Sequence, residues 1–284
     1  MPIQYPEILS LASDDVPARY GDRETMLYAL GIGMGADPMN DKELPFVYEN
    51  GLKAMPTMAT VIAWGAGSLV GQMGINYLMV VHGEQKLEIH KPLPSAAEIK
   101  ARARVLGVYD KGKDKGAVIY TETTIVEADT GTKLATLVSS TFARGDGGFG
   151  GPADGAPEPH PTPTRAPDAT LALSTRPDQA LIYRLSGDRN PLHSDPNVAR
   201  LAGFPRPILH GLCSYGVTCR AILQTFADYD PARIKHFDVR FSAPVFPGET
   251  IVTRMWKDGD VIAFDAAVAE RNVTVIKNGR CVLA

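Results

Sequence analysis

Two sets of segments in this chain alternate between apolar and polar residues, which is the pattern of β-strands that bury one face. The first set is rich in Thr, Val and Ile, which favours antiparallel pairing, and it predicts strands at residues 86–90, 99–109, 117–128 and 133–144. The second set predicts strands at residues 235–241, 250–256, 261–270 and 273–283. The pattern therefore indicates two β regions in one chain.

Helical patterns precede both sets of strands. Residues 22–30 carry apolar side chains at helical spacing, and residues 56–69 are apolar on nearly every side, which predicts a helix that is buried on most sides. A further helix is predicted at residues 211–226, and residues 241–249 then occupy the place that residues 91–94 hold in the first half. A helix followed by antiparallel strands occurs twice, which predicts an α+β fold made of two copies of one unit.

The two copies are separated by a segment of different composition. Residues from about 145 to 168 are rich in Gly, Pro, Ala and Asp and have no apolar periodicity, so we expect a linker that wanders over the surface. The predicted domains are a first unit at residues 1–148, a linker at residues 149–168 and a second unit at residues 169–284. The first 20 residues give weak signals and are expected to form an extended lead-in.

Composition narrows the class of protein and its location. The chain has 284 residues and a formal net charge of −3, which argues against a nucleic-acid partner. No apolar run approaches membrane-spanning length, and the first residues do not form a signal peptide. The three cysteines (Cys213, Cys219, Cys281) lack metal or disulfide spacing, which favours buried thiols in a reducing compartment. The last four residues are not a peroxisomal address, so we expect a cytoplasmic protein.

Candidate chemistry is concentrated in residues 183–196, which contain Asp188, Asn190 and His193. The pairs Gly-Asp and Asn-Pro in this segment form turns, and Pro191 disfavours α geometry at the residue before it. Side chains on a turn can converge on one point, which helical spacing of i and i+5 would not allow. A plain surface turn is the alternative interpretation, because Asp and Asn are common in turns for local hydrogen bonding.

A short helix is predicted immediately after this turn. Asp195 followed by Pro196 has the pattern of an N-cap with proline at the first helical position, and Gly203 is expected as the left-handed cap near its end. We therefore interpret Asp195 as a helix cap rather than as a second base.

Together with Pro-Ile-Leu-His-Gly at residues 207–211, this segment resembles the signature of the MaoC-like, (R)-specific enoyl-CoA hydratase family, hydratase 2, which includes the hydratase part of peroxisomal multifunctional enzyme type 2. The resemblance spans nearly the whole chain and includes residues 28–33, 46–49 and 55–57. Three glycines at residues 31–35 could suggest a dinucleotide loop, but the preceding strand that such a loop needs is missing. The family implies a double hot-dog fold, in which a curled antiparallel sheet wraps a long helix in each unit and the two units pair as a dimer would.

Hydration of a 2-enoyl thioester requires a base that activates water, an acid that protonates C2, and donors for the charge on the thioester oxygen. Asp188 and His193 can share the proton transfers around one water, and Asn190 can orient the water or the carboxylate. Gly211 begins a predicted helix, so its free N–H can stabilise the oxyanion. These four residues match the family's catalytic and oxyanion positions. The resemblance implies reversible syn addition of water that gives the 3R product, with the base and the acid not assigned between Asp188 and His193.

The first unit lacks this signature and resembles the family's non-catalytic copy, which holds the acyl group and part of coenzyme A. The resemblance assigns substrate binding to seven residues: His82, Gly83, Lys111, Arg189, Phe241, Tyr28 and Glu49. Lys111 could instead belong to a solvated turn, because residues 111–116 are longer than the family's usual turn. Glu49 could alternatively be a partner in an interface or in a core salt bridge.

Four alternatives concern two other side chains and two other functions. His210 could cap backbone groups as a buried histidine or could take part in catalysis, and Cys213 has no orienting third group that would make it a nucleophile. A hot-dog acyl-CoA thioesterase would share the fold but would lack the signature. A non-catalytic acyl-CoA-binding protein would be favoured if Asp188 or His193 were replaced, and both are present.

The expected substrate is an acyl-CoA thioester, with coenzyme A as part of the substrate, no separate cofactor, no metal and a homodimeric assembly. The predicted helix at residues 56–69 contains Ala63, Gly65, Ala66 and Gly67. Glycine inside a helix is about 1 kcal/mol less favourable than alanine, so these residues require a reason. Close packing is one reason, and room for a medium-chain or bulky acyl group, including a steroid side chain, is the other.

Overall fold

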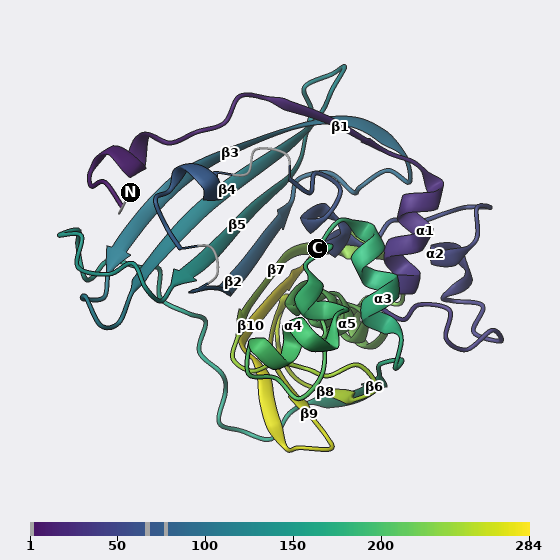
Figure 1. The fold of residues 1–284 in the computed structure, drawn as a ribbon. Helices are drawn as coiled ribbons and strands as arrows, with labels where there is room; N and C mark the ends of the chain where they lie inside the picture. Colours follow the sequence, from purple (N-terminus) through teal and green to yellow (C-terminus); the bar gives the residue numbers. More distant parts are fainter. Residues whose placement is uncertain (1–2, 66–68, 77–78) are drawn as a thin grey trace.

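The computed structural model describes residues 3–65, 69–76 and 79–284. Its framework is one antiparallel sheet of ten strands in the order β1-β3-β4-β5-β2-β7-β10-β9-β8-β6 (Figure 1). The strands are β1 (Val16–Tyr20), β2 (Val80–Ile89), β3 (Ala97–Asp110), β4 (Ala117–Glu127), β5 (Lys133–Ala143), β6 (Ala169–Ser174), β7 (Ile234–Phe241), β8 (Thr250–Asp258), β9 (Val261–Val268) and β10 (Val273–Leu283).

The strand order shows the internal repeat directly. The first five strands fill one half of the sheet and the last five fill the other, and β2 and β7 meet at the seam, where Glu84 lies opposite Arg240. In both halves the short leading strand, β1 or β6, lies at the outer edge, and the remaining strands follow in the same relative order. The predicted repetition is confirmed, and it extends to β1 and β6, which the sequence pattern did not reveal.

Helices are unequally distributed between the halves. They are α1 (Asp22–Gly31), α2 (Leu44–Val47), α3 (Gln179–Tyr183), α4 (Pro196–Leu201) and α5 (Gly211–Phe226). Short 3₁₀ helices occur at Glu7–Ser10, Pro56–Thr60, Val70–Gln72, Arg184–Ser186, Pro191–His193 and Pro231–Arg233. In the second half α5 contacts β6, β7 and β8, and every residue from 212 to 223 is buried. This is the helix expected inside a hot-dog unit, and its bounds match the prediction. Among the described residues, no helix combines the length and the apolar character needed to cross a bilayer.

The predicted helix at residues 56–69 is wrong. Of the described residues in this range, only Pro56–Thr60 is helical, as a 3₁₀ turn, and residues 61–65 form further turns. Gly65 has a φ of +78°, which an α-helix does not contain, so the apolar composition reflects burial of an irregular segment rather than helical periodicity. Ala66 and Gly67, which also entered the prediction of room for the acyl group, lie outside the described residues.

The segment between β5 and β6 is exposed at many positions, as predicted, but hydrogen bonds to both units fix its path. The backbone N–H of Asp110 donates to Pro152 O at 2.8 Å, and the Asp110 carboxylate accepts from the N–H groups of Gly148 and Gly150 at 2.8 Å each. At its far end, the amide of Asn278 donates to His160 O at 2.8 Å. The polar groups of both units therefore anchor the linker along its path below the sheet (Figure 1).

Candidate active site

Asp188 lies on a turn that the local sequence constrains. The preceding Gly187 has a φ of +142°, and a Cβ at this position would lie 2.7 Å from the Trp64 side chain, so the turn requires glycine. The N–H of Asn190 donates to Asp188 Oδ1 at 3.0 Å, and the N–H of Leu192 donates to Asn190 Oδ1 at 3.0 Å. The oxygen of Asn190 thus caps the turn, and the donor that this side chain can offer to a water is its NH₂ group.

His193 is held in one tautomer by a backbone carbonyl. Its Nδ1 lies 2.9 Å from Ile208 O, and because a carbonyl can only accept, Nδ1 carries the proton and Nε2 keeps a lone pair. The side chain is nearly buried, at 9% exposure. Burial lowers the pKa of His193 below the ordinary 6.5, against the opposing effects of the Ile208 hydrogen bond and the Asp188 charge. The imidazole is therefore neutral at pH 7 and can accept a proton at Nε2.

His210 supports this arrangement from the buried side. Its ring stacks on His193 with centroids 3.7 Å apart, and its Nε2 donates to the backbone oxygen of Asp188 at 3.1 Å. Burial lowers the pKa of His210 to about 3, with a smaller contribution from the neighbouring His193. A neutral histidine that bonds the Asp188 backbone fits the predicted role of a buried capping residue.

Asp188, His193 and His210 offer side-chain atoms that all lie within 4.8 Å of one another. The two imidazole rings are stacked with an interplanar angle of 26°, and one nitrogen of each ring donates to a backbone oxygen. The Asp188 carboxylate and the lone pair on His193 Nε2 can therefore share one water.

The predicted oxyanion position lies at the start of α5. Gly211 is the first residue of this helix, and its own N–H has no acceptor within the helix. The ring of Phe241, from the end of β7, lies where a Cβ at Gly211 would meet it at 3.4 Å, and it packs on His82 at a centroid distance of 4.9 Å. The sequence predicted that His82 precedes a strand, but His82 lies within β2. A β-bulge falls between His82 and Glu84. Residues of both halves therefore meet at the seam between β2 and β7.

A cavity of about 870 Å³ brings most of the predicted site together. The predicted residues that line it are Asp188, Asn190, His193, Gly211, His82, Gly83, Lys111 and Phe241. Tyr28, Glu49 and Arg189 are not among the lining residues. Tyr28 is fully buried and packs on Tyr183, which in turn packs on His210, whereas Arg189 is exposed. Direct substrate binding by these three residues stays a prediction.

Glu49 is exposed, so its alternative role as a core salt-bridge partner is wrong. That role belongs to Glu43, which is 1% exposed and binds Arg220 of α5 through Nε at 2.9 Å and Nη2 at 2.7 Å. The other carboxylate oxygen of Glu43 accepts from the N–H of Gly35 at 2.8 Å. The periodicity of the sequence could not distinguish the two glutamates, because both lie in an irregular segment.

Other side chains near the site have clear structural roles. Asp195 caps α4 by accepting from the N–H of Asn197 at 2.8 Å, and Gly203 follows the helix with a φ of +85°, as predicted. All three cysteines are buried and free. Burial raises the pKa of the Cys213 thiol, which donates to Gly31 O, so this thiol is not a nucleophile.

The cavity also includes residues that the sequence did not indicate. The linker contributes Ala156, Pro157, Glu158 and Pro159 to its wall. Lys111 is fixed beside this segment, because its Nζ donates to Ala153 O and lies 5.7 Å from the Tyr109 ring. No periodicity in the linker could have revealed this role, since it depends on anchors that are distant in sequence.

Comparison with known proteins defines the class. The model of the MaoC like domain matches residues 158–279, and the model of the MFE-2 hydratase 2 N-terminal domain matches residues 19–145. Enoyl-CoA hydratase ChsH3 of Mycobacterium tuberculosis is 40% identical over 98% of this chain and 98% of its own length. The peroxisomal enoyl-CoA hydratase 2 of Arabidopsis thaliana is 41% identical over 90% of this chain and 88% of its own length. This chain belongs to the MaoC-like hydratase 2 family.

Solved structures agree with this assignment. A MaoC-like dehydratase from Phytophthora capsici superposes with a TM-score of 0.88 at 37% identity, covering 99% of both chains. A Mycobacterium tuberculosis protein described as a double hot-dog fold has a TM-score of 0.58 at 15% identity, with coverage of 96% of this chain and 95% of that one, which bears on the fold alone. The architecture is therefore a double hot dog, as predicted.

Proposed function

We propose that this protein is an (R)-specific 2-enoyl-CoA hydratase, a hydro-lyase that adds water reversibly to a trans-2-enoyl-CoA. The observation that carries the proposal is the placement of the Asp188 carboxylate and the neutral His193 in one cavity with the start of α5. The hydratase relatives described above support the same reaction and a coenzyme A thioester as the substrate.

The site residues divide the work of the reaction. A water between Asp188 and His193 loses a proton to one of them while its oxygen bonds to C3, and the electron pair of the alkene moves toward the thioester oxygen. The N–H of Gly211 stabilises the charge that collects there, and removing one such donor typically costs about 2.7–4 kcal/mol of transition-state stabilisation. The proton taken from the water is then delivered to C2 as the thioester carbonyl re-forms. The one proton of the neutral His193 imidazole is hydrogen-bonded to Ile208 O through Nδ1, so the C2 proton originates from the attacking water.

Delivery of both parts of one water from one side of the alkene gives syn addition and a 3R product. The test is to couple hydration to a 3R-specific and, separately, to a 3S-specific hydroxyacyl-CoA dehydrogenase, while the ultraviolet absorbance of the enoyl thioester is followed. Oxidation by the 3R enzyme alone is expected. Oxidation by the 3S enzyme, or release of free thiol without hydration, would overturn the assignment.

We propose a medium-chain or bulky acyl group, including steroid side chains, as the substrate. The cavity of about 870 Å³ supports this choice, because its volume lies at the upper end of the usual range of ligand pockets. We expect kcat/KM to rise from a four-carbon enoyl-CoA toward medium-chain, branched or ring-bearing ones. A preference for the four-carbon substrate would contradict this proposal.

The remaining properties are proposals of the same kind. We propose a cytoplasmic homodimer that needs neither a metal nor a separate cofactor. Retention of full activity after dialysis against EDTA, a dimeric mass by light scattering and recovery in the cytoplasmic fraction are the expected results.

A further inference from the structure

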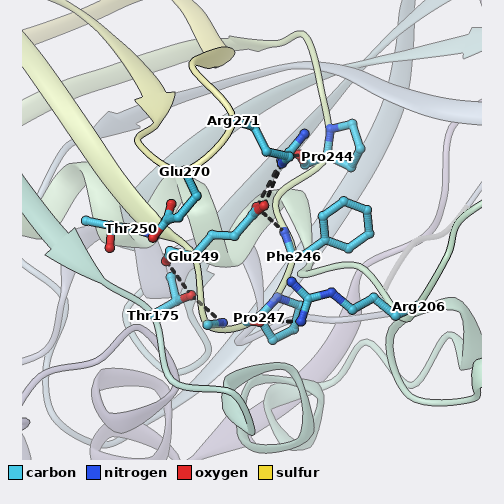
Figure 2. A network of polar contacts seen from close by, with 10 residues as sticks. Thr175, Arg206, Pro244, Phe246, Pro247, Glu249, Thr250, Glu270 and Arg271 are labelled. Atoms are coloured by element: carbon cyan, nitrogen blue, oxygen red, sulfur yellow. Dashed lines mark hydrogen bonds and ion pairs between the residues drawn. The ribbon is translucent and has the colours of Figure 1, made fainter.

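The loop between β7 and β8, residues 242–249, has a network of polar contacts that the reaction itself does not use (Figure 2). One end of the loop lines the cavity through Ser242, Ala243, Pro244 and Val245. The other end holds Phe246, Pro247, Gly248 and Glu249, none of which lines the cavity. The network therefore fixes a loop that forms part of the cavity wall, through residues that do not themselves line the cavity.

An ion pair between Glu249 and Arg271 forms the centre of the network. Arg271 Nε lies 2.5 Å from Glu249 Oε1, and Nη2 donates both to Oε2 at 2.9 Å and to Pro244 O at 2.7 Å. The N–H of Phe246 donates to Oε2 at 2.7 Å. Burial alone would raise the pKa of Glu249, but the hydrogen bonds from Arg271 and Phe246 outweigh it and hold that pKa below its ordinary value. The carboxylate is therefore charged, and the pair is intact, at neutral pH.

Further contacts fix the loop from two other segments of the chain. The Phe246 ring lies between the guanidinium groups of Arg206 and Arg271, each 5.1 Å from the ring centroid (Figure 2). Thr175, which follows β6, donates through Oγ1 to Glu249 O at 2.7 Å and accepts from the N–H of Gly248 at 2.9 Å. The loop thus has little freedom to shift.

Two backbone contacts lead from this loop to the catalytic histidine. The N–H of Leu209 donates to Val245 O at 2.7 Å. Ile208, the residue before Leu209, supplies the carbonyl that accepts from His193 Nδ1 at 2.9 Å. The position of Val245 therefore sets the position of the carbonyl that selects the His193 tautomer.

We propose that the Arg271–Glu249 pair is a positioning device for His193. By fixing Val245, the pair keeps the Ile208 carbonyl hydrogen-bonded to Nδ1 of His193. The lone pair of His193 Nε2 then stays available in the cavity. Neither Arg271 nor Glu249 lines the cavity, so their effect is on the orientation of the base rather than on substrate contact. The kinetic part of this inference rests on the proposed hydratase function, whereas the tautomer of His193 can be measured without it.

The chain contains a matched control for the ion pair. Arg254 on β8 binds Asp265 on β9 through Nε at 2.7 Å and Nη2 at 2.6 Å, which is the same bidentate chemistry. Asp265 and Glu249 are each 5% exposed. Neither Arg254 nor Asp265 lines the cavity. Arg254→Met therefore leaves a buried carboxylate unpaired, as Arg271→Met does, without releasing the loop.

The experiment compares kcat, KM and long-range ¹⁵N–¹H spectra of the histidines in both variants, with His193→Ala used to assign the signal. We expect Arg271→Met to lower kcat by about 10-fold or more with KM changed by less than about 3-fold, because small misplacements of a catalytic group have effects of this size. The Nδ1–H signature of His193 should weaken. Arg254→Met should change neither quantity. Arg271→Lys should recover part of kcat, because lysine keeps the charge but not the bidentate geometry.

A kcat for Arg271→Met equal to that of Arg254→Met, or an unchanged His193 spectrum, overturns the proposal. If Arg271→Met does not fold, Arg206→Met decides, because this exposed residue contributes only the stack on Phe246 and a bond to Pro247 O. A lower kcat and an altered His193 spectrum are then expected, and wild-type values overturn the proposal. If the wild-type protein has no hydratase activity, the proposed function fails, and the His193 spectrum alone tests the positioning role of the ion pair. Failure of the proposed function and failure of the positioning role are therefore distinguishable.

Discussion

At the scale of single residues, the proposed proton chemistry depends on Asp188 and His193, which lie in one short segment. We expect Asp188→Asn and His193→Ala each to lower kcat by about 10²–10⁴-fold, the usual contribution of a positioned acid or base. The two groups serve one water, so the double variant should be little worse than either single variant. Enoyl absorbance gives the rates, and circular dichroism checks the fold. Near wild-type turnover in either single variant would refute the assignment.

The pH dependence should follow His193. With His193 as the proton acceptor, activity needs its unprotonated form, so a pKa below the ordinary 6.5 extends activity toward lower pH. We expect kcat/KM to be level through neutral pH and to fall only on the acid side of 6.5. Measurement of kcat/KM across the pH range in buffers of constant ionic strength checks this. A midpoint at or above 6.5 would contradict a neutral, buried His193.

That Asp188, Asn190 and His193 lie together at one cavity could be predicted because they are close in sequence, in a segment whose geometry follows from Gly187 and Pro191. Tyr28 and Glu49 could not be placed in the same way. Tyr28 lies in α1 and Glu49 in the irregular segment after α2, so their positions relative to the cavity depend on packing between distant segments, which no local pattern encodes.

At the scale of elements, long and strongly patterned segments could be predicted, and α5 and β10 have the predicted bounds. The edge strands β1 and β6 could not, because they have only five and six residues, and few of these are buried. The helix expected at residues 56–69 failed for the opposite reason. Its residues are apolar throughout, and a segment without a polar face does not show whether it is helical.

The linker provides a test at this scale. Asp110 accepts from the N–H groups of Gly112, Gly148 and Gly150, and the linker residues beyond this anchor line the cavity. Asp110→Ala should release the linker and raise the KM for enoyl-CoA several-fold while kcat stays nearly constant. Asp129→Ala, in the turn between β4 and β5, is the control. Equal KM values for the two variants would show that the linker does not shape the cavity.

At the scale of the whole molecule, one apolar core spans both halves. Tyr28 and Leu87 of the first half belong to the same buried cluster as Tyr215 and Phe237 of the second. We expect thermal unfolding in a single transition, with equal calorimetric and van't Hoff enthalpies. The fragment of residues 169–284 should not fold alone, because it would expose β7 and half of this core. Two separate calorimetric peaks would show that the halves are independent.

The β2–β7 seam lies within a single polypeptide, and this has a consequence for dilution. If the halves were separate chains, they would dissociate at protein concentrations below their dissociation constant. The side of the cavity that contains His82 would then separate from the side that contains Asp188. Because both halves belong to one chain and the linker between them is anchored on both, the local concentration of one half around the other does not fall on dilution. The cavity therefore stays assembled in a solution of any protein concentration, and turnover per molecule does not depend on two halves meeting by diffusion.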